Sequence, residues 1–174
     1  STEFTILGVS SSWTLGSPRY EDFIKISTLI QEDMQIVLIG QSKITEWPQN
    51  IKHIRFISDT NELAKLYSSA DVYVHLSTED TFGKVVAEAM ACGVPAIVYN
   101  STALPEIIEE GCGYVVEKRD VEGVVEAIFE IQHKGKDHYT DNCLSHIAKN
   151  FDYDHNTKML IKLYESVIKG YRNQ

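Results

Sequence analysis

Cysteine is scarce in this sequence. The 174 residues include only three cysteines, Cys92, Cys112 and Cys143. They are odd in number, and none of them forms the short paired spacing that is typical of a zinc site. We therefore expect reduced thiols, and neither a disulfide-stapled scaffold nor a cysteine-ligated metal.

Basic residues and long apolar runs are also scarce. Sixteen Lys and Arg stand against 25 Asp and Glu, which gives a net charge of −9. Non-specific nucleic-acid binding needs a basic face, so we expect no nucleic-acid partner. No apolar run approaches the roughly 20 residues of a membrane helix. The first residues carry no basic segment of a secretory signal, so we expect a cytoplasmic location.

The sequence does contain alternating apolar runs and segments of helical periodicity. With 43% hydrophobic residues, 174 residues suffice for one domain with a real core. Strands are predicted at residues 5–9, 35–40, 51–57, 71–76, 94–99 and 113–116, and helices at 20–31, 61–70, 83–91, from 105 to near 111, and 156–169, with a further helical stripe between 121 and 131. This order predicts an α/β fold: a single Rossmann-like, doubly wound domain of about six parallel strands flanked by helices.

The stretch from Glu79 to Gly93 carries most of the candidate chemistry. Asp80 ends an apolar strand, a helix begins near Gly83, and Glu88 follows one to two turns into that helix. A helix start offers free N–H groups and a positive dipole end, which suit phosphate or sugar oxygens, and glycine allows close approach to the backbone. Ligands of doubly wound sheets bind beyond the carboxyl ends of the strands, where this stretch lies. The alternative is that these carboxylates only complement the helix dipole or are solvated.

Three blocks of the sequence, residues 70–74, 80–95 and 105–107, resemble the donor-binding domain of GT-B glycosyltransferases of family 4. These enzymes are retaining and metal-independent, and they carry two carboxylates with seven residues between them. Asp80 and Glu88 have this separation. The resemblance extends from about residue 6 to 167. It implies that residues 1–174 form the C-terminal half of a GT-B enzyme, a nucleotide-sugar donor-binding domain without its N-terminal acceptor domain.

The resemblance also implies roles for individual residues. Glu88 would bind the ribose hydroxyls of the donor, and Asp80 would lie beside the reacting sugar carbon, so both are the expected catalytic-site carboxylates. Backbone amides would face the sugar (Phe82, Gly83, Lys84) and the diphosphate (Lys84, Val85). The backbone of Ile57 and Ser58 would hold the nucleobase. The donor would be a UDP- or GDP-sugar. No metal and no further cofactor are expected, because basic side chains and helix N-termini carry the diphosphate charge in this family.

The sequence departs from the family pattern at three places. The first carboxylate is usually Glu; Asp80 stands there, and Glu79 is the counterpart if the loop shifts by one residue. The position of Phe82 and Gly83 favours Asp80. Thr102 and Ala103 stand where the family often has two glycines.

Arg19 marks the third departure. The family usually places an Arg and a Lys after the first strand, and Arg19 is the only base in residues 10–19. It lies one position beyond the expected lysine, so it either binds the diphosphate or is a surface arginine at a helix start. His75 is interpreted as a satisfied core or edge histidine. Trp13 is interpreted as a packing residue, with ligand contact as the alternative because it lies at the ligand-binding edge.

The function implied is transfer of a sugar from a nucleotide-diphosphate sugar to an acceptor, in cell-surface glycan or polysaccharide synthesis. The chain alone is expected to be inactive, because the acceptor site belongs to the N-terminal domain. Apolar residues of the last helix, such as Leu160 and Val167, would face that missing half, and the full enzyme is expected to associate peripherally with the inner membrane face. The alternatives are half of a nucleotide-sugar epimerase and a non-catalytic Rossmann-like binding module.

Overall fold

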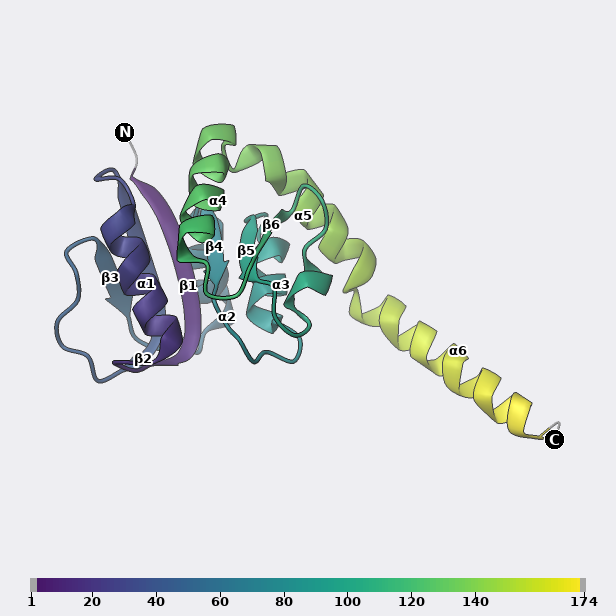
Figure 1. The fold of residues 1–174 in the computed structure, drawn as a ribbon. Coiled ribbons are helices and arrows are strands. Elements are labelled where there is room, and N and C mark those ends of the chain that lie inside the picture. Colours follow the sequence, from purple (N-terminus) through teal and green to yellow (C-terminus); the bar gives the residue numbers. More distant parts are fainter. Residues whose placement is uncertain (1–2, 173–174) are drawn as a thin grey trace.

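The computed structural model describes residues 3–172 and contains one six-stranded parallel sheet (Figure 1). The strands lie in the order β3-β2-β1-β4-β5-β6, which confirms the predicted doubly wound fold. The strands are β1 (Phe4–Trp13), β2 (Met34–Ser42), β3 (Ile51–Ile54), β4 (Val72–His75), β5 (Ala96–Tyr99) and β6 (Gly113–Val116). The helices are α1 (Pro18–Leu29), α2 (Thr60–Ser69), α3 (Lys84–Ala91), the 3-10 turn η1 (Leu104–Ile107), α4 (Val121–Lys134), α5 (Asp137–Asn150) and α6 (Tyr153–Arg172).

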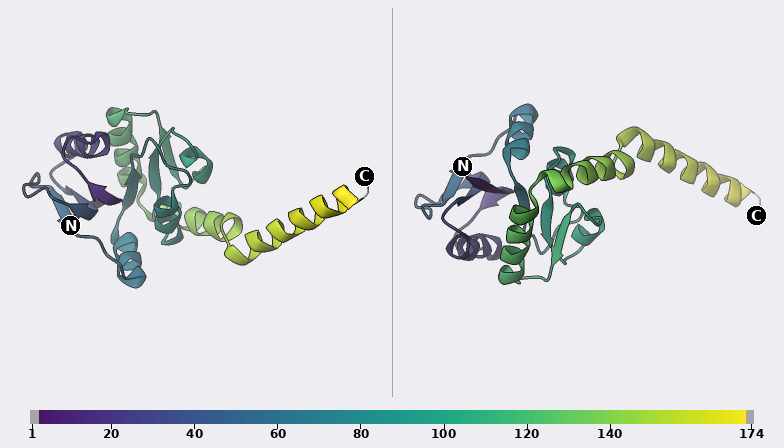
Figure 2. Two further views of the ribbon diagram at one scale, coloured as in Figure 1. Left: turned by 90° about the horizontal axis from the view of Figure 1, so that it is seen from below. Right: turned by 90° about the horizontal axis from the view of Figure 1, so that it is seen from above.

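Helices cover both faces of the sheet. α1 packs against α4 on one face, and α3 packs against α2 and α5 on the other (Figures 1 and 2). The central strands β4 and β5 are buried along their whole length, as expected for strands covered on both sides. The strand order reverses between β1 and β4, so the crevice expected of this fold lies at their carboxyl ends.

β1 is longer than the sequence pattern predicts. The apolar run ends at Val9, but the strand continues to Trp13 through an irregularity between Val9 and Ser12. The buried Trp13 indole donates a hydrogen bond to the Ile39 carbonyl at 3.0 Å and packs edge-on against Phe23. These contacts of Trp13 extend the strand through the serines at positions 10–12. They confirm Trp13 as a packing residue.

Two other predicted elements are shorter in the structure. β3 is an edge strand that ends at Ile54 rather than 57, so Phe56 lies in the following loop and is 59% exposed. The helix predicted from Pro105 to near Gly111 is only the four-residue turn η1, because the backbone becomes extended at Ile108 (ψ 106°).

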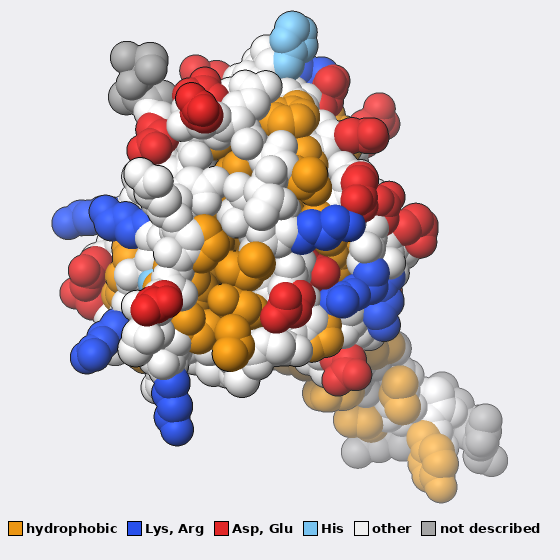
Figure 3. All heavy atoms as spheres, turned by 60° about the vertical axis from the view of Figure 1, so that its left-hand side comes forward, with side chains coloured by type: hydrophobic (Ala, Val, Ile, Leu, Met, Phe, Trp, Pro, Cys, Tyr) orange, Lys and Arg blue, Asp and Glu red, His pale blue; other side chains and the backbone are white. Residues whose placement is uncertain are grey.

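α6 projects away from the body of the domain (Figures 1 and 2). It is longer than predicted, and apolar side chains along it are visible in the space-filling view (Figure 3). The exposed ones include Met159, Leu160, Ile161, Leu163, Tyr164, Val167 and Ile168. Within residues 3–172, neither α6 nor any other helix is long and apolar enough to cross a membrane.

Candidate functional site

A cavity of about 640 Å³ opens at the carboxyl ends of β1 and β4, at the point where the strand order reverses. It brings together most of the residues predicted from the sequence: Arg19, Ile57, Ser58, Asp80, Lys84, Val85 and Glu88. Phe82 and Gly83 are not among its lining residues. Phe82 instead packs edge-on against Phe151 at the start of the C-terminal segment.

Asp80 is held firmly by its surroundings. Its Oδ1 accepts the backbone N–H groups of Phe82 at 3.1 Å and of Gly83 at 2.8 Å, while its Oδ2 lies 3.0 Å from Nε2 of His75. These bonds hold the turn that leads into α3, whose N-cap residue is Gly83. The Phe82 and Gly83 amides that we expected to face a sugar are occupied by Asp80.

His75 is buried and lies between two polar partners. Burial lowers its pKa, and Arg19 contributes in the same direction against the opposing effect of Asp80, so the ring is neutral at pH 7. Burial tends to raise the pKa of Asp80, but hydrogen bonds from Phe82, Gly83 and His75 outweigh it and lower that pKa. An ionised Asp80 requires His75 to donate from Nε2, and Nδ1 then accepts from the Tyr73 hydroxyl at 3.4 Å.

Gly83 adopts a left-handed conformation with φ 78° at the N-cap of α3. A Cβ there would lie 2.7 Å from Leu104 Cδ2 and 2.9 Å from Ile107 Cδ1, both from η1. The sequence suggested that this glycine gives a ligand access to the backbone. The structure shows a different reason, namely close packing of η1 against the start of α3.

Glu88 lies one turn further along α3, where it lines the cavity with 36% of its side chain exposed. Its Oε2 accepts the Tyr67 hydroxyl at 3.3 Å, and its Oε1 lies 3.5 Å from Lys84 Nζ. Burial raises the pKa of Tyr67, and Glu88 adds to the effect, so the phenol remains a donor. Tyr67 and Lys84 therefore orient the Glu88 carboxylate, and part of its side chain remains exposed in the cavity.

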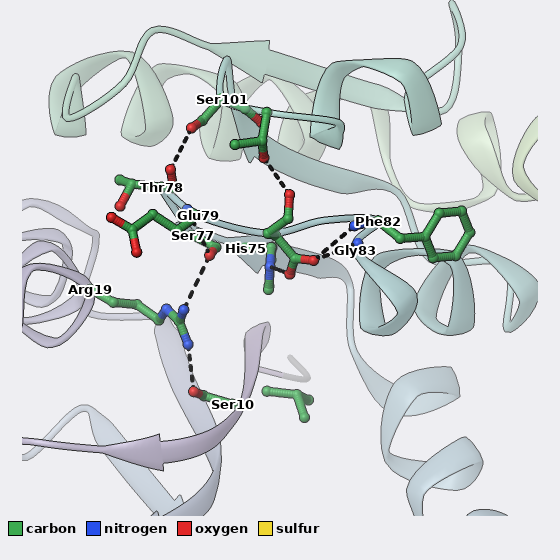
Figure 4. Close-up of polar contacts among 12 residues, drawn as sticks. Ser10, Arg19, His75, Ser77, Thr78, Glu79, Phe82, Gly83 and Ser101 are labelled. Atoms are coloured by element: carbon green, nitrogen blue, oxygen red, sulfur yellow. Dashed lines mark hydrogen bonds and ion pairs between the residues drawn. The ribbon is translucent and has the colours of Figure 1, made fainter.

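Arg19 reaches into the cavity from the first turn of α1. Its guanidinium donates to Ser10 Oγ at 2.5 Å and to Ser77 Oγ at 3.2 Å, so it bridges the ends of β1 and β4 (Figure 4). Arg19 is half-buried and lines the cavity, so it is not a freely exposed surface arginine. Ser10 and Ser77, both nearly buried, were not predicted as site residues, because single serines carry no spacing signal.

Thr102 shows why the family pattern often has glycine at this position. It has φ 52°, a left-handed conformation that a residue with a side chain adopts only at a cost. Its hydroxyl donates to the backbone carbonyl of Asp80, and the neighbouring Ser101 Oγ donates to the Thr78 carbonyl at 2.8 Å. The loop after β5 thereby holds the loop after β4 from two sides.

A second hollow of about 850 Å³ lies one strand away, between the ends of β1 and β2. Its lining includes Leu15, Lys43, Ile44 and Glu46, and none of the predicted site residues. Among residues 3–172, no three His, Cys, Asp or Glu side chains are grouped as they would be to hold a metal ion. More charged side chains line the smaller cavity than this hollow, and we take the smaller cavity as the candidate site.

A doubly wound sheet with a cation, a helix N-terminus and two carboxylates at its switch point defines a nucleotide-binding type of α/β domain. Residues 19–145 match the family described as "Glycosyl transferases group 1", and the chain therefore belongs to this family.

The curated relatives that the chain matches are longer than this chain. It is 37% identical over 114 residues (61% of the chain, 29% of the relative) to a GDP-mannose-dependent alpha-(1-6)-phosphatidylinositol dimannoside mannosyltransferase of Mycobacterium tuberculosis. Anabaena HepE in complex with UDP has the same fold with TM-score 0.80 at 17% identity, covering 94% of this chain and 49% of HepE. The C-terminal domain of a glycosyl transferase group 1 protein (LpcC) from Francisella tularensis superimposes with TM-score 0.70 at 24% identity, covering 86% and 87%. The chain thus spans half or less of the two longer proteins.

Proposed function

We propose that this chain is the donor-binding domain of a retaining, metal-independent glycosyltransferase of the GT-B family 4 type. The observation that carries the proposal is the cavity at the switch point, where Arg19, the N-terminus of α3 and Glu88 surround one hollow of about 640 Å³. The donor would be a nucleotide-diphosphate sugar. HepE is described in complex with UDP, and the mycobacterial relative is named GDP-mannose-dependent, which supports a uridine or guanosine base.

The donor would extend along the cavity from the loop after β3 to the loop after β4. The backbone at Ile57 and Ser58 would hold the base, and Glu88 would accept two hydrogen bonds from the ribose diol. The diphosphate would lie between Arg19 and the free amides of Lys84 and Val85. These amides belong to the first turn of α3, where the helix dipole also favours negative charge.

This arrangement needs no metal for the diphosphate. Arg19, Lys84 and the α3 N-terminus would together stabilise the negative charge that develops on the leaving diphosphate. Holding the sugar carbon in place against the acceptor supplies the rest of the acceleration. The sugar would lie at the far end of the cavity, beside Glu79 and Asp80.

The acceptor site would belong to an N-terminal domain outside this chain. The likeness to a C-terminal domain of a family member supports residues 1–174 as one donor domain. The exposed apolar residues of α6 would then pack against the other half, and the isolated chain would bind donor without turnover. We further propose a role in cell-surface glycan or polysaccharide synthesis, with the full enzyme in the cytoplasm at the inner membrane face.

Calorimetry with the chain and a panel of UDP, GDP, ADP and their sugar derivatives tests the proposal. We expect one nucleoside diphosphate to bind, and Glu88→Ala to weaken its affinity about tenfold or more. Glu126→Ala is the matched control, because Glu126 is an exposed acid on α4 outside the cavity. Absence of binding at millimolar concentration for the whole panel would contradict the proposal.

A further inference from the structure

Two adjacent carboxylates, Glu79 and Asp80, line the end of the cavity where the donor sugar would lie. Their surroundings differ in kind. Asp80 is built into the protein by its hydrogen bonds, whereas Glu79 is exposed. The difference raises the question of which carboxylate is available to a ligand.

Asp80 has little acceptor capacity left. A carboxylate offers about four lone-pair positions, and three are occupied by Phe82 N–H, Gly83 N–H and the His75 ring. Only about a quarter of its side chain is exposed. A sugar hydroxyl could take the last position only, and a move of the carboxylate toward the ligand would break its hydrogen bonds to the turn that precedes α3.

Glu79 has the opposite character. In the described part of the chain its carboxylate makes no hydrogen bond or ion pair; only its backbone N–H is engaged, with Ser77 Oγ at 3.4 Å. Figure 4 shows its side chain pointing away from His75, toward the side of the cavity on which Arg19 lies. Both oxygens are free to accept from the two hydroxyls of a vicinal diol, the usual hydrogen-bonding pattern of a pyranose ring.

Contacts of the loop prevent a shift that would exchange the positions of the Glu79 and Asp80 side chains. Thr102 holds the carbonyl of Asp80, Ser101 holds that of Thr78, and Gly83 is fixed between η1 and α3. A one-residue shift of the loop would break these contacts together. The roles of the two carboxylates are therefore set by the fold.

We infer that Glu79 is the residue that binds the hydroxyl groups of the donor sugar, while Asp80 positions the loop and the start of α3. This inference rests on the proposed function, and it assigns sugar selection to a side chain one position before the carboxylate that the family spacing indicates. Glu79 is longer by one methylene and makes no side-chain hydrogen bond, so it can reach a pyranose ring that Asp80 cannot approach without losing its bonds to Phe82 and Gly83.

The test compares two charge-removing substitutions of equal size, Glu79→Gln and Asp80→Asn. For each variant, calorimetry gives the ratio of the dissociation constants of the nucleoside diphosphate and of its sugar conjugate, which isolates the contribution of the sugar. Thermal unfolding is recorded in parallel. Both substitutions preserve side-chain shape, and Asn retains an acceptor for the Phe82 and Gly83 amides, so both variants are expected to fold.

We expect Glu79→Gln to bind the nucleoside diphosphate at least as tightly as the wild type, since a negative charge near the diphosphate is removed. The sugar-dependent gain is the ratio of the dissociation constant of the nucleoside diphosphate to that of its sugar conjugate, and it should fall about fivefold or more in this variant. Asp80→Asn should keep that gain within about twofold and lower the melting temperature, because its neutral amide is a weaker acceptor for the Phe82 and Gly83 amides and a changed partner for His75.

The opposite pattern, loss of the gain in Asp80→Asn and its retention in Glu79→Gln, would overturn the inference. So would a wild type that binds the diphosphate but gains nothing from any sugar, and this result would leave the proposed donor site standing. If no nucleoside diphosphate binds at all, both the site and the inference fail.

Discussion

Nε2 of the buried His75 lies 3.0 Å from Oδ2 of Asp80, and this contact links the end of β4 to the N-terminus of α3. The histidine is neutral and the carboxylate ionised, so the link is a hydrogen bond to a charged acceptor rather than an ion pair. Such bonds contribute about 1.5–3 kcal/mol when buried. The contact therefore stabilises the loop that forms one end of the cavity.

The pH dependence of stability should reflect this pair. Burial lowers the pKa of His75 below its ordinary value of 6.5, so the unfolded chain binds a proton that the folded chain excludes. Stability is then unaffected by this group above pH 6.5 and falls as the pH decreases below it. We expect His75→Asn to flatten the decline of the unfolding free energy between pH 6.5 and 5, as measured by urea denaturation at each pH.

The lowered pKa of Asp80 acts at more acidic pH. Its stabilisation is present above the ordinary carboxyl pKa of 3.8 and is lost as the pH falls through the still lower folded value. In His75→Asn, part of this decline of the unfolding free energy at acidic pH should remain, because the Phe82 and Gly83 amides still bind the Asp80 carboxylate. Equal slopes for wild type and variant between pH 6.5 and 5 would show that His75 is not the responsible group.

Gly83→Ala should be strongly destabilising. The substitution combines a left-handed backbone with overlap against Leu104 and Ile107, and we expect a loss of about 2–4 kcal/mol in unfolding free energy. Gly16→Ala is the control, since Gly16 has φ 74° but no atoms within 4 Å of the added methyl. The control measures the cost of the left-handed backbone, about 1–2 kcal/mol, and equal losses in the two variants would refute the packing argument.

Arg19 should serve the phosphates rather than the nucleoside. We expect Arg19→Ala to weaken binding of the nucleoside diphosphate about tenfold or more and that of the free nucleoside less than about twofold, because only the former presents an anion to the guanidinium. Arg55→Ala provides a control, since Arg55 is an exposed arginine that does not line the cavity. Equal weakening of both ligands would point to a structural role for the bridge between Ser10 and Ser77.

The sequence pattern predicted the sheet because four of its six strands are apolar runs bounded by turn residues, and the parallel order follows from their alternation with helices. The resemblance also implied that Glu88 belongs to the site and left the role of Arg19 open, and both line the cavity. The continuation of β1 to Trp13 could not be predicted, because it depends on one indole hydrogen bond to β2. The hydrogen bonds of Asp80 to His75 and to two backbone amides could not be predicted either. Local spacing gives no information about which acceptor positions tertiary contacts occupy.

The last prediction concerns α6, whose side chains contribute nothing to the buried core of the described chain. Removal of residues 153–174 should therefore leave the melting temperature within about 2 °C, since a loss of 1 kcal/mol in a domain of this size shifts it by about 2–4 °C. The same removal should reduce self-association, because it deletes the stripe that includes Leu160, Leu163 and Val167. Sedimentation velocity of the two chains at equal concentration measures this difference, and Lys162→Ala in the intact chain controls for changes confined to the polar side chains of the helix. A large drop in melting temperature on truncation would mean that α6 folds back onto the domain, and its apolar stripe would then be unavailable to an N-terminal half.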